Sequence, residues 1–153
     1  MGKASPIRIV CAANDAYAKP MAVMLTSLLL NKKSRTPVRI YVIDGGGLSA
    51  RSKRRLRRAV APFGASLKFL PFDNAKLAGL SRLSVYKRYG KEAFYRIFIP
   101  ELFGLKVRRA LYLDSDLIVR RDITRLWRMP LRGALAAAAK DPSAPRMTRR
   151  LGL

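Results

Sequence analysis

The chain has 153 residues, half of them hydrophobic, which is enough for one domain with a real core and excludes a disordered basic tail. Its 32 Lys and Arg against 9 Asp and Glu give a net charge of +23, which attracts polyanions over long distances. The lack of histidine nearly excludes a His/Cys zinc site and a Ser-His-Asp or Cys-His catalytic machine.

The first part of the chain predicts a strand followed by a helix. Ile7–Ala13 is expected to be a buried strand, in which the single Cys11 is a small hydrophobe rather than a nucleophile. Asn14–Tyr17 is expected to form the turn after it. A helix is expected over Tyr17–Asn31, and its apolar face is predicted to consist of Met21, Met24, Leu25 and Leu28.

A second strand, Val38–Ile43, is expected to end at Asp44 and three glycines. Gly45-Gly46-Gly47 lacks both phosphate-loop spacings and is interpreted as a flexible turn. A basic helix should follow, capped by Ser49, with a solvated basic face. Its buried stripe is predicted to consist of Leu56, Val60 and Phe63.

The remaining predicted elements are a third strand at Ser66–Phe72, an irregular stretch at Leu77–Gly90, a helical segment at Glu92–Phe103, a fourth strand at Ala110–Val119 and a fifth at Leu135–Lys140. Pro100 either kinks the helical segment or begins a new turn, and the alanines before Lys140 suit a helix as well. This alternation predicts the α/β class, with a mostly parallel sheet covered on both faces. In such sheets ligands bind beyond the carboxyl ends of the strands.

Acidic residues gather where strands are expected to end. Five of the nine lie at or just after such an end, namely Asp15, Asp44, Asp73, Asp114 and Asp141. Asp114-Ser115-Asp116 interrupts an apolar run, and because a strand points alternate side chains to one face, both carboxylates are expected to converge on one cation. Carboxylate oxygens suit Mg2+ and Mn2+, and two of them leave positions for phosphates. A solvated turn is the alternative for the bare triplet.

Several segments occur in a fixed order across nearly the whole chain: RIVCAANDAYAKPMAVMLTSLL, VRIYVID, AFYRIFIPELF, ALYLDSDLIVRRDITRLW and AAKDP. In this order they resemble the retaining nucleotide-sugar glycosyltransferases of family 8, the galactosyltransferase and glycogenin group. The resemblance implies a Rossmann-like domain of the GT-A type, a single nucleotide-sugar-binding domain over residues 1–153. It also implies Mn2+-dependent (or Mg2+-dependent) transfer of a hexose from a UDP-sugar to a saccharide or lipopolysaccharide acceptor, with retention.

The same resemblance implies roles for individual residues. Tyr17 would stack on uracil, although a ring packed against the sheet is the alternative, and Arg96 would touch the donor near the metal, although a surface arginine is the alternative. The implied nucleotide-binding residues are Ala12, Ala13, Asn14, Asp15, Tyr17 and Ser115. The implied donor-sugar residues are Arg96 and Asp141, and the implied metal ligands are Asp114 and Asp116. No catalytic nucleophile is identified.

The chain departs from the family pattern in having no histidine. The family has a histidine metal ligand in its C-terminal half, which this chain lacks. The family also often has a histidine at the position that Arg88 takes here. We therefore expect the N-terminal part of a glycosyltransferase domain, truncated at its C-terminus. Two alternatives stay open: a non-catalytic nucleotide-binding remnant, and a nucleic-acid-binding module supported by charge alone.

The expected location is cytoplasmic, because no long apolar signal core is seen and Met21–Leu30 is too short to span a bilayer, which needs about 20 apolar residues. An anionic membrane surface is a further possible partner, since a polybasic protein is attracted to the inner face of a membrane.

Overall fold

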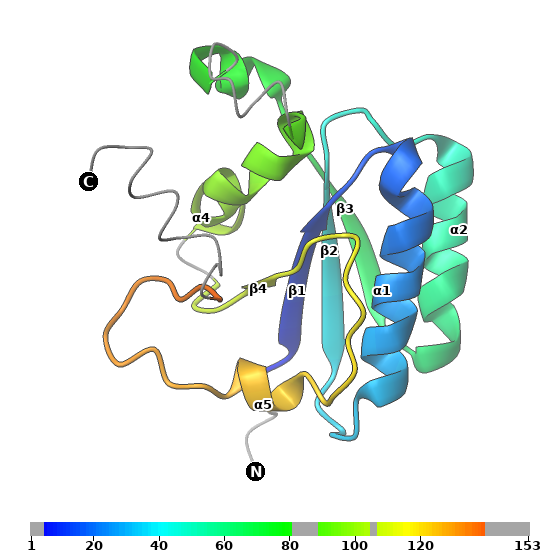
Figure 1. Cartoon of the computed structure of the whole chain (residues 1–153), viewed down its shortest axis with the longest axis vertical. Coiled ribbons are helices and arrows are strands. Elements are labelled where there is room, and N and C mark those ends of the chain that lie inside the picture. The colour runs from blue at the N-terminus through cyan, green and yellow to red at the C-terminus, as the bar shows by residue number, and fades with distance from the viewer. Residues whose placement is uncertain (1–4, 81–88, 105–106, 140–153) are drawn as a thin grey trace.

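The computed structural model describes residues 5–80, 89–104 and 107–139, and a parallel sheet forms its centre (Figure 1). The strands are β1 (Ile7–Ala12), β2 (Val38–Asp44), β3 (Ser66–Pro71) and β4 (Leu111–Tyr112), in the order β3-β2-β1-β4. All three neighbouring pairs are parallel. The predicted α/β class and parallel sheet are confirmed, and the carboxyl ends of the strands therefore share one edge.

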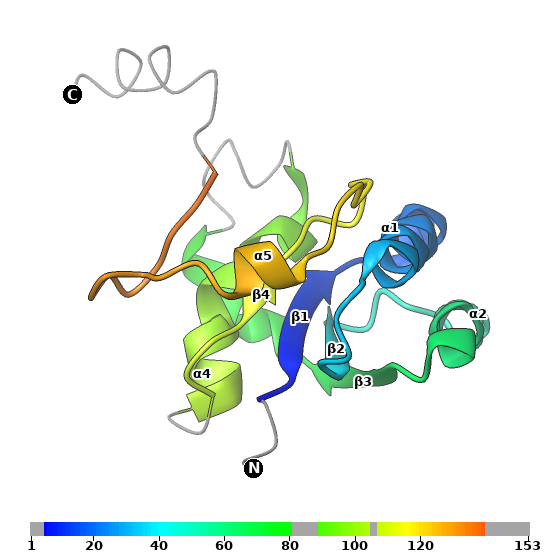
Figure 2. The ribbon, with the colours of Figure 1, turned by 90° about the horizontal axis from the view of Figure 1, so that it is seen from below.

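Helical segments connect and cover the strands. They are η1 (Asp15–Tyr17), α1 (Ala18–Asn31), α2 (Ala50–Val60), η2 (Ala61–Phe63), η3 (Asn74–Leu80), η4 (Lys91–Phe98), α4 (Ile99–Phe103) and α5 (Thr124–Trp127), where η marks 3-10 geometry. Figure 2 shows α1 and α2 side by side on one side of the sheet and α4 on the other. None of the described helices is both long and apolar enough to cross a membrane.

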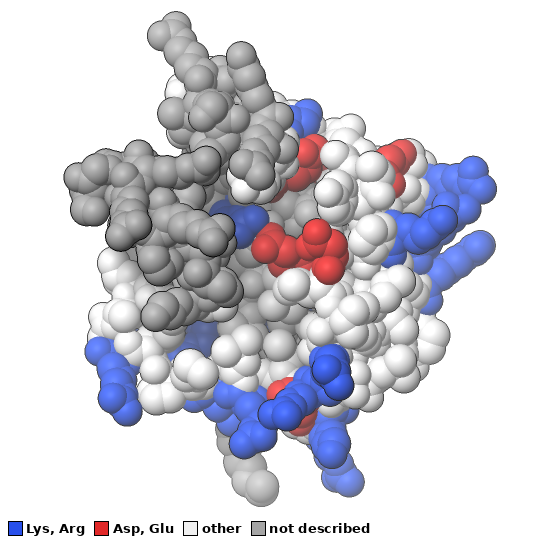
Figure 3. Space-filling model, in the orientation of Figure 1, with Lys and Arg blue, Asp and Glu red and all other residues white. Residues whose placement is uncertain are grey.

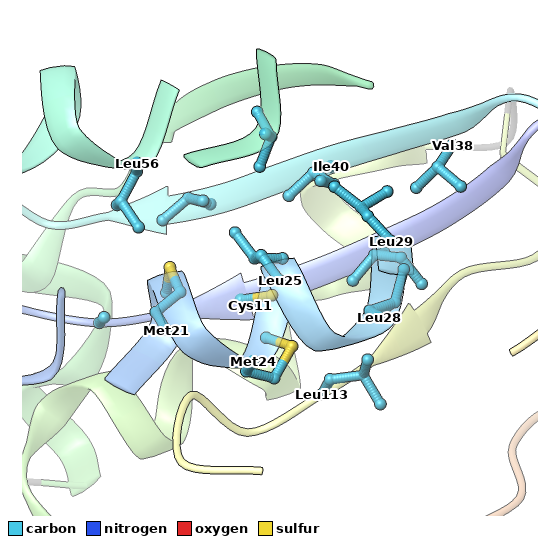
Figure 4. Close-up of a cluster of buried hydrophobic side chains, with 14 of the residues drawn as sticks. Cys11, Met21, Met24, Leu25, Leu28, Leu29, Val38, Ile40, Leu56 and Leu113 are labelled. Atoms are coloured by element: carbon cyan, nitrogen blue, oxygen red, sulfur yellow. The ribbon is translucent and has the colours of Figure 1, made fainter. Parts of the chain in front are cut away.

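The first core cluster lies between the sheet and the layer formed by α1 and α2. Met21, Met24, Leu25 and Leu28 are fully buried against Cys11 and Leu56, as Figure 4 shows, so the predicted apolar face of α1 is confirmed. The predicted stripe of α2 is confirmed at Leu56 and Val60 but is wrong at Phe63, which is exposed. The reason is that α2 ends at Val60, and the 3-10 turn after it, which contains a proline, breaks the 3.6-residue period.

The second core cluster covers the opposite face of the sheet. Val10 and Ile43 pack there with Phe72 and Tyr95, whose ring centroids lie 4.4 Å apart. The prediction that both faces are covered is therefore confirmed. The predicted helical segment 92–103 consists of η4 followed by α4, and Pro100 in the first turn of α4 begins the new turn.

The predicted fourth strand, Ala110–Val119, is wrong beyond Tyr112. The amide of Leu113 still donates to the Val10 carbonyl at 2.9 Å, but the chain then leaves the sheet. Side chains of α1 bind the backbone of Val119 instead: its N–H donates to Ser27 Oγ at 2.9 Å, and Asn31 Nδ2 donates to its carbonyl at 2.9 Å. These two bonds take the place of β-ladder bonds at Val119.

The predicted fifth strand, Leu135–Lys140, is also wrong over residues 135–139, which form neither strand nor helix and are exposed. Lys140 lies outside the described residues. The predicted irregular stretch after Leu77 begins within η3, and residues 81–88 lie outside the described part of the chain.

Candidate functional site

The loop after β1 is tied to the loop after β2. Asn14 Oδ1 caps η1 by accepting the amides of Ala16 and Tyr17 at 3.1 and 3.3 Å. The amide of Asp15 donates to the Gly47 carbonyl at 2.8 Å, and Asp15 Oδ1 accepts the Ser49 amide at 2.8 Å. The Ser49 amide, followed by nearby serine hydroxyls, holds the pKa of Asp15 below its ordinary value. Asp15 therefore acts as an ionised link between the two loops.

The loop after β2 folds around Asp44, which is buried. Its Oδ1 accepts the amides of Gly46 and Leu48 at 2.9 and 3.3 Å, and its Oδ2 lies 2.5 Å from Lys53 Nζ. The three glycines form a turn after β2, as predicted, but Gly45 is tightly packed: a Cβ added there would lie only 2.1 Å from Tyr95 Oη. Close packing, rather than flexibility, requires a glycine there.

Two residues that sequence reasoning missed hold this loop from the other side. Asn74 Nδ2 donates to the Gly45 carbonyl at 2.7 Å, and Tyr95 Oη donates to Asn74 Oδ1 at 2.7 Å. Asn74 follows β3 and Tyr95 lies in η4, so this chain of bonds joins three elements. The only signal in the sequence was that Asn74 follows a strand end and that Tyr95 precedes Arg96.

The structure brings Arg96 and Asp114 into contact. Arg96 Nη2 donates to Asp114 Oδ1 at 2.7 Å, and the guanidinium lies 4.4 Å from the centroid of the Tyr112 ring. Arg96 Nε also donates to the Ala93 carbonyl at 2.8 Å. Both charged side chains are about half exposed, at 43 and 48 %. The pair is therefore positioned by other contacts and remains accessible to a ligand.

Ser115 fixes the acidic triplet against the end of β1. It is buried, and its Oγ donates to the Ala12 carbonyl at 2.7 Å. Asp114 lies two residues after the end of β4, whereas Asp116 is exposed in a turn. The strand alternation that was expected to make both carboxylates converge is therefore wrong, and the turn geometry of the alternative is what the structure has.

The donor set of the triplet fits a hard divalent cation. Two accessible carboxylates provide oxygen ligands of the type that Mg2+ and Mn2+ prefer, and they leave coordination positions for phosphate oxygens. Among the residues that the structure describes, no three or more His, Cys, Asp or Glu side chains cluster closely enough to form a complete metal site. Figure 3 shows acidic side chains near the centre of the face in view, next to a basic side chain.

The other residues that the sequence singled out are buried, exposed or outside the described part of the chain. Ala12 and Ala13 are buried, so only their backbone can face a ligand, whereas Tyr17 is 49 % exposed and is not packed into the core. Cys11 is buried as predicted, and desolvation, followed by the charge of Asp114, raises its pKa to about 12. Asp141 and Arg88 lie outside the described residues.

The chain matches known proteins over most of its length. The family model described as "Glycosyl transferase family 8" matches residues 8–151. General stress protein A of Bacillus subtilis is 34 % identical over 142 residues, which cover 92 % of this chain and 48 % of the relative. Glycosyltransferase 8 domain-containing protein 1 of Xenopus tropicalis is 39 % identical over 134 residues, which cover 87 % of this chain and 32 % of the relative.

A shorter match and a solved structure agree with these relatives. The lipopolysaccharide 1,2-glucosyltransferase of Escherichia coli is 40 % identical over 53 residues, 35 % of this chain and 16 % of that enzyme. The crystal structure of the galactosyltransferase LgtC with donor and acceptor sugar analogues has a TM-score of 0.69 and 26 % identity, and covers 82 % of this chain and 43 % of that one.

The chain thus spans less than half the length of each of these four proteins. Its parallel sheet and flanking helices match the GT-A-like glycosyltransferase fold of LgtC. Together with the match over residues 8–151, this fold shows that the chain belongs to glycosyl transferase family 8.

Proposed function

We propose that this chain forms the nucleotide-sugar-binding part of an enzyme that transfers a hexose from a UDP-sugar to a saccharide or lipopolysaccharide acceptor. The proposed reaction depends on Mn2+ or Mg2+ and retains the anomeric configuration. The observation that carries the proposal is the contact of Arg96 with Asp114 beside the end of β1, in a chain of this family. The names of two relatives, a lipopolysaccharide glucosyltransferase and a galactosyltransferase, support a hexose as the transferred group.

In this proposal Asp114 and Asp116 hold the cation. The cation, when bound, neutralises negative charge on the diphosphate as the bond between sugar and phosphate breaks. Arg96 holds Asp114 in place through its Oδ1 and adds a positive charge beside the diphosphate. Ser115 fixes the turn through the Ala12 carbonyl, so the carboxylates need little reorganisation when a ligand arrives.

Tyr17 and the tied loops form the proposed nucleoside side of the site. The Tyr17 ring is half exposed at the start of α1, where it can stack on a base. Asn14 orders the turn that carries this ring, and Asp15 anchors that turn to Ser49. The ring is thus presented by an ordered turn, which lowers the entropic cost of binding a base.

The metal site is tested by titrating UDP, with and without Mn2+, into the wild type and into Asp114→Asn and Asp116→Asn. Both variants should lose the Mn2+-dependent part of UDP affinity and keep the fold by circular dichroism. Asp73→Asn is the matched control: it makes the same charge change after β3, where the carboxylate accepts the Ala75 amide at 2.9 Å. Unchanged metal-dependent affinity in either triplet variant would sink the assignment.

The base site is tested on the same samples with Tyr17→Ala. Loss of a stacked base should weaken UDP binding by about 1–3 kcal/mol, with or without metal. If Tyr17 has only a structural role, the variant will melt earlier and its folded fraction will bind UDP normally.

Turnover is measured separately, as UDP release from UDP-glucose and from UDP-galactose with Mn2+. UDP binding without release would favour the non-catalytic alternative. Binding of nucleic acid without binding of UDP would favour a basic nucleic-acid module instead.

A further inference from the structure

Helix α2 carries an unusual density of positive charge. Six of its 11 residues are Lys or Arg, and none is acidic. Its buried residues are Ser52, Leu56 and Val60, which lie on one side of the helix. At 3.6 residues per turn, the opposite side is formed by Arg51, Arg54 and Arg58, with Arg55 at its border. All four of these arginines are exposed.

The structure uses two of the six cations internally. Lys53 pairs with the buried Asp44 and lies 5.5 Å from the centroid of the Phe69 ring. Arg57 lies 5.0 Å from the centroid of the same ring. The outer arginines differ: within the described residues, none of Arg51, Arg54, Arg55 and Arg58 forms an ion pair. Their charges are therefore directed to solvent and can interact with an external anion.

Helix α1 adds apolar groups to the same layer. Its buried residues cover one side, and the opposite side carries Lys19, Val23 and Leu30. Val23 is 51 % exposed and Leu30 is 67 % exposed. Because α1 and α2 lie side by side and both bury their inner sides against the sheet, their outer sides form one continuous surface (Figures 1 and 2). Figure 3 shows one group of basic side chains at the edge where α2 lies and another at the lower edge of the molecule.

We propose that this surface, formed by Lys19, Val23 and Leu30 of α1 and Arg51, Arg54, Arg55 and Arg58 of α2, docks on an anionic lipid bilayer. The arginines meet the phosphates of the headgroups, which attract basic residues at a membrane surface. Val23 and Leu30 enter the boundary between headgroups and acyl chains, as the apolar residues of interfacial helices do.

The composition of the surface favours a bilayer over a nucleic acid. A groove that binds single-stranded nucleic acid combines positive charge with aromatic rings on which bases stack. The outer sides of α1 and α2 present aliphatic residues and no aromatic ring between their charges. Aliphatic groups gain from leaving water at a lipid interface and have no such partner on a phosphate backbone.

Docking here would hold the candidate site next to the membrane. Helix α1 follows the turn of Asn14–Tyr17, and α2 follows the loop that ends at Ser49. The bond between Asp15 and Ser49 therefore lies at the beginning of both docking helices. The proposed surface does not include Asp114, so Asp114→Asn should bind vesicles as the wild type does even though it loses the Mn2+-dependent part of its UDP affinity. The two proposals can thus fail separately.

The test is co-sedimentation of the 153-residue chain with vesicles of phosphatidylcholine alone, and with vesicles that also contain about 30 % phosphatidylglycerol, at about 0.15 M salt. Binding is expected only to the anionic vesicles. Since each basic residue near such a surface contributes about fivefold, the triple variant Arg51→Gln, Arg54→Gln, Arg58→Gln should bind on the order of 100-fold more weakly. The double variant Val23→Ser, Leu30→Ser should also bind less, with the charge unchanged.

The matched control is Arg120→Gln, Arg121→Gln, Arg125→Gln, which removes the same charge from exposed residues beyond the α1–α2 layer. It should retain vesicle binding to within about fivefold. Equal losses in both triple variants would reduce the effect to net charge and overturn the proposal. So would absence of vesicle binding, preferred binding to RNA through the same arginines, or a dimer that Val23→Ser, Leu30→Ser dissociates. Thermal melting of each variant verifies that the fold is retained.

Discussion

Gly45→Ala adds one methyl group to the loop after β2 and therefore tests how tightly the loops at the strand ends are packed. The added Cβ would lie 2.1 Å from Tyr95 Oη and 2.7 Å from Asn74 Oδ1. Tyr95 is buried, and its hydroxyl donates to Asn74, so its ring cannot withdraw without breaking that bond. Overpacking costs about 1–3 kcal/mol, and a buried hydrogen bond left unmade costs about 1–3 kcal/mol more. We expect the free energy of unfolding to fall by about 2–6 kcal/mol, which lowers Tm by about 4–24 °C.

Urea unfolding followed by circular dichroism measures this loss. The matched control is Gly79→Ala, whose Cβ would meet nothing within 4 Å and whose φ lies outside the left-handed region, so its stability should change by less than about 1 kcal/mol. Tyr95→Phe in the Gly45→Ala background should recover part of the loss, because the nearest remaining ring atom, Cζ, is 2.8 Å away. Equal stability of the two glycine variants, or strict additivity in the double variant, would refute the steric reasoning.

Two further predictions concern titratable groups. Burial and the charge of Asp114 raise the pKa of Cys11 to about 12. Its thiol should therefore resist a disulfide reagent at pH 8 in the folded chain and react on unfolding. Rapid labelling of the folded chain would contradict its burial. The Ser49 amide lowers the pKa of Asp15, so its contribution to stability is complete above the ordinary value of 3.8 and is lost as the pH falls below it. Asp15→Asn should therefore flatten the acid side of the stability–pH curve, and a wild-type-like acid midpoint would exclude this role.

The first half of the fold could be predicted because its signals are local. The apolar side of α1 repeats at helical spacing, and Ser49 caps α2 by accepting the Ser52 amide at 3.2 Å. Both signals lie within a few residues of the element that they define. Strands β1 and β2 are mostly apolar and largely buried, apart from Arg8 and Arg39, which is typical of a parallel sheet covered on both faces.

The region after Tyr112 could not be predicted, because its structure depends on distant residues. The apolar composition of residues 117–119 suits a strand, yet Ile118 is exposed. The bonds that replace the strand come from Ser27 and Asn31, which are 92 and 88 residues away from Val119 in sequence. No pattern within a short window indicates that helix side chains will bind a particular backbone group.

The candidate site shows the same division. Local pattern and resemblance brought Arg96, Asp114 and Ser115 into one hypothesis, and the structure places the first two in contact. The contacts of Asn74 and Tyr95 with Gly45 were missed, since each residue by itself is ordinary at its position. Their importance lies in mutual geometry across three elements, which a sequence does not display.

The Arg96–Asp114 pair illustrates how such geometry serves a site rather than the fold. Both side chains are about half exposed, and ion pairs of this kind contribute only about 0–1 kcal/mol to stability. The stacking of Arg96 over Tyr112 and its bond to the Ala93 carbonyl nevertheless restrict the guanidinium to one orientation. An orientation fixed by several contacts, for a pair that adds little stability, favours a role in binding. In the proposed site, Arg96 would compensate the charge of Asp114 before a cation arrives, and would then lie ready to meet the diphosphate.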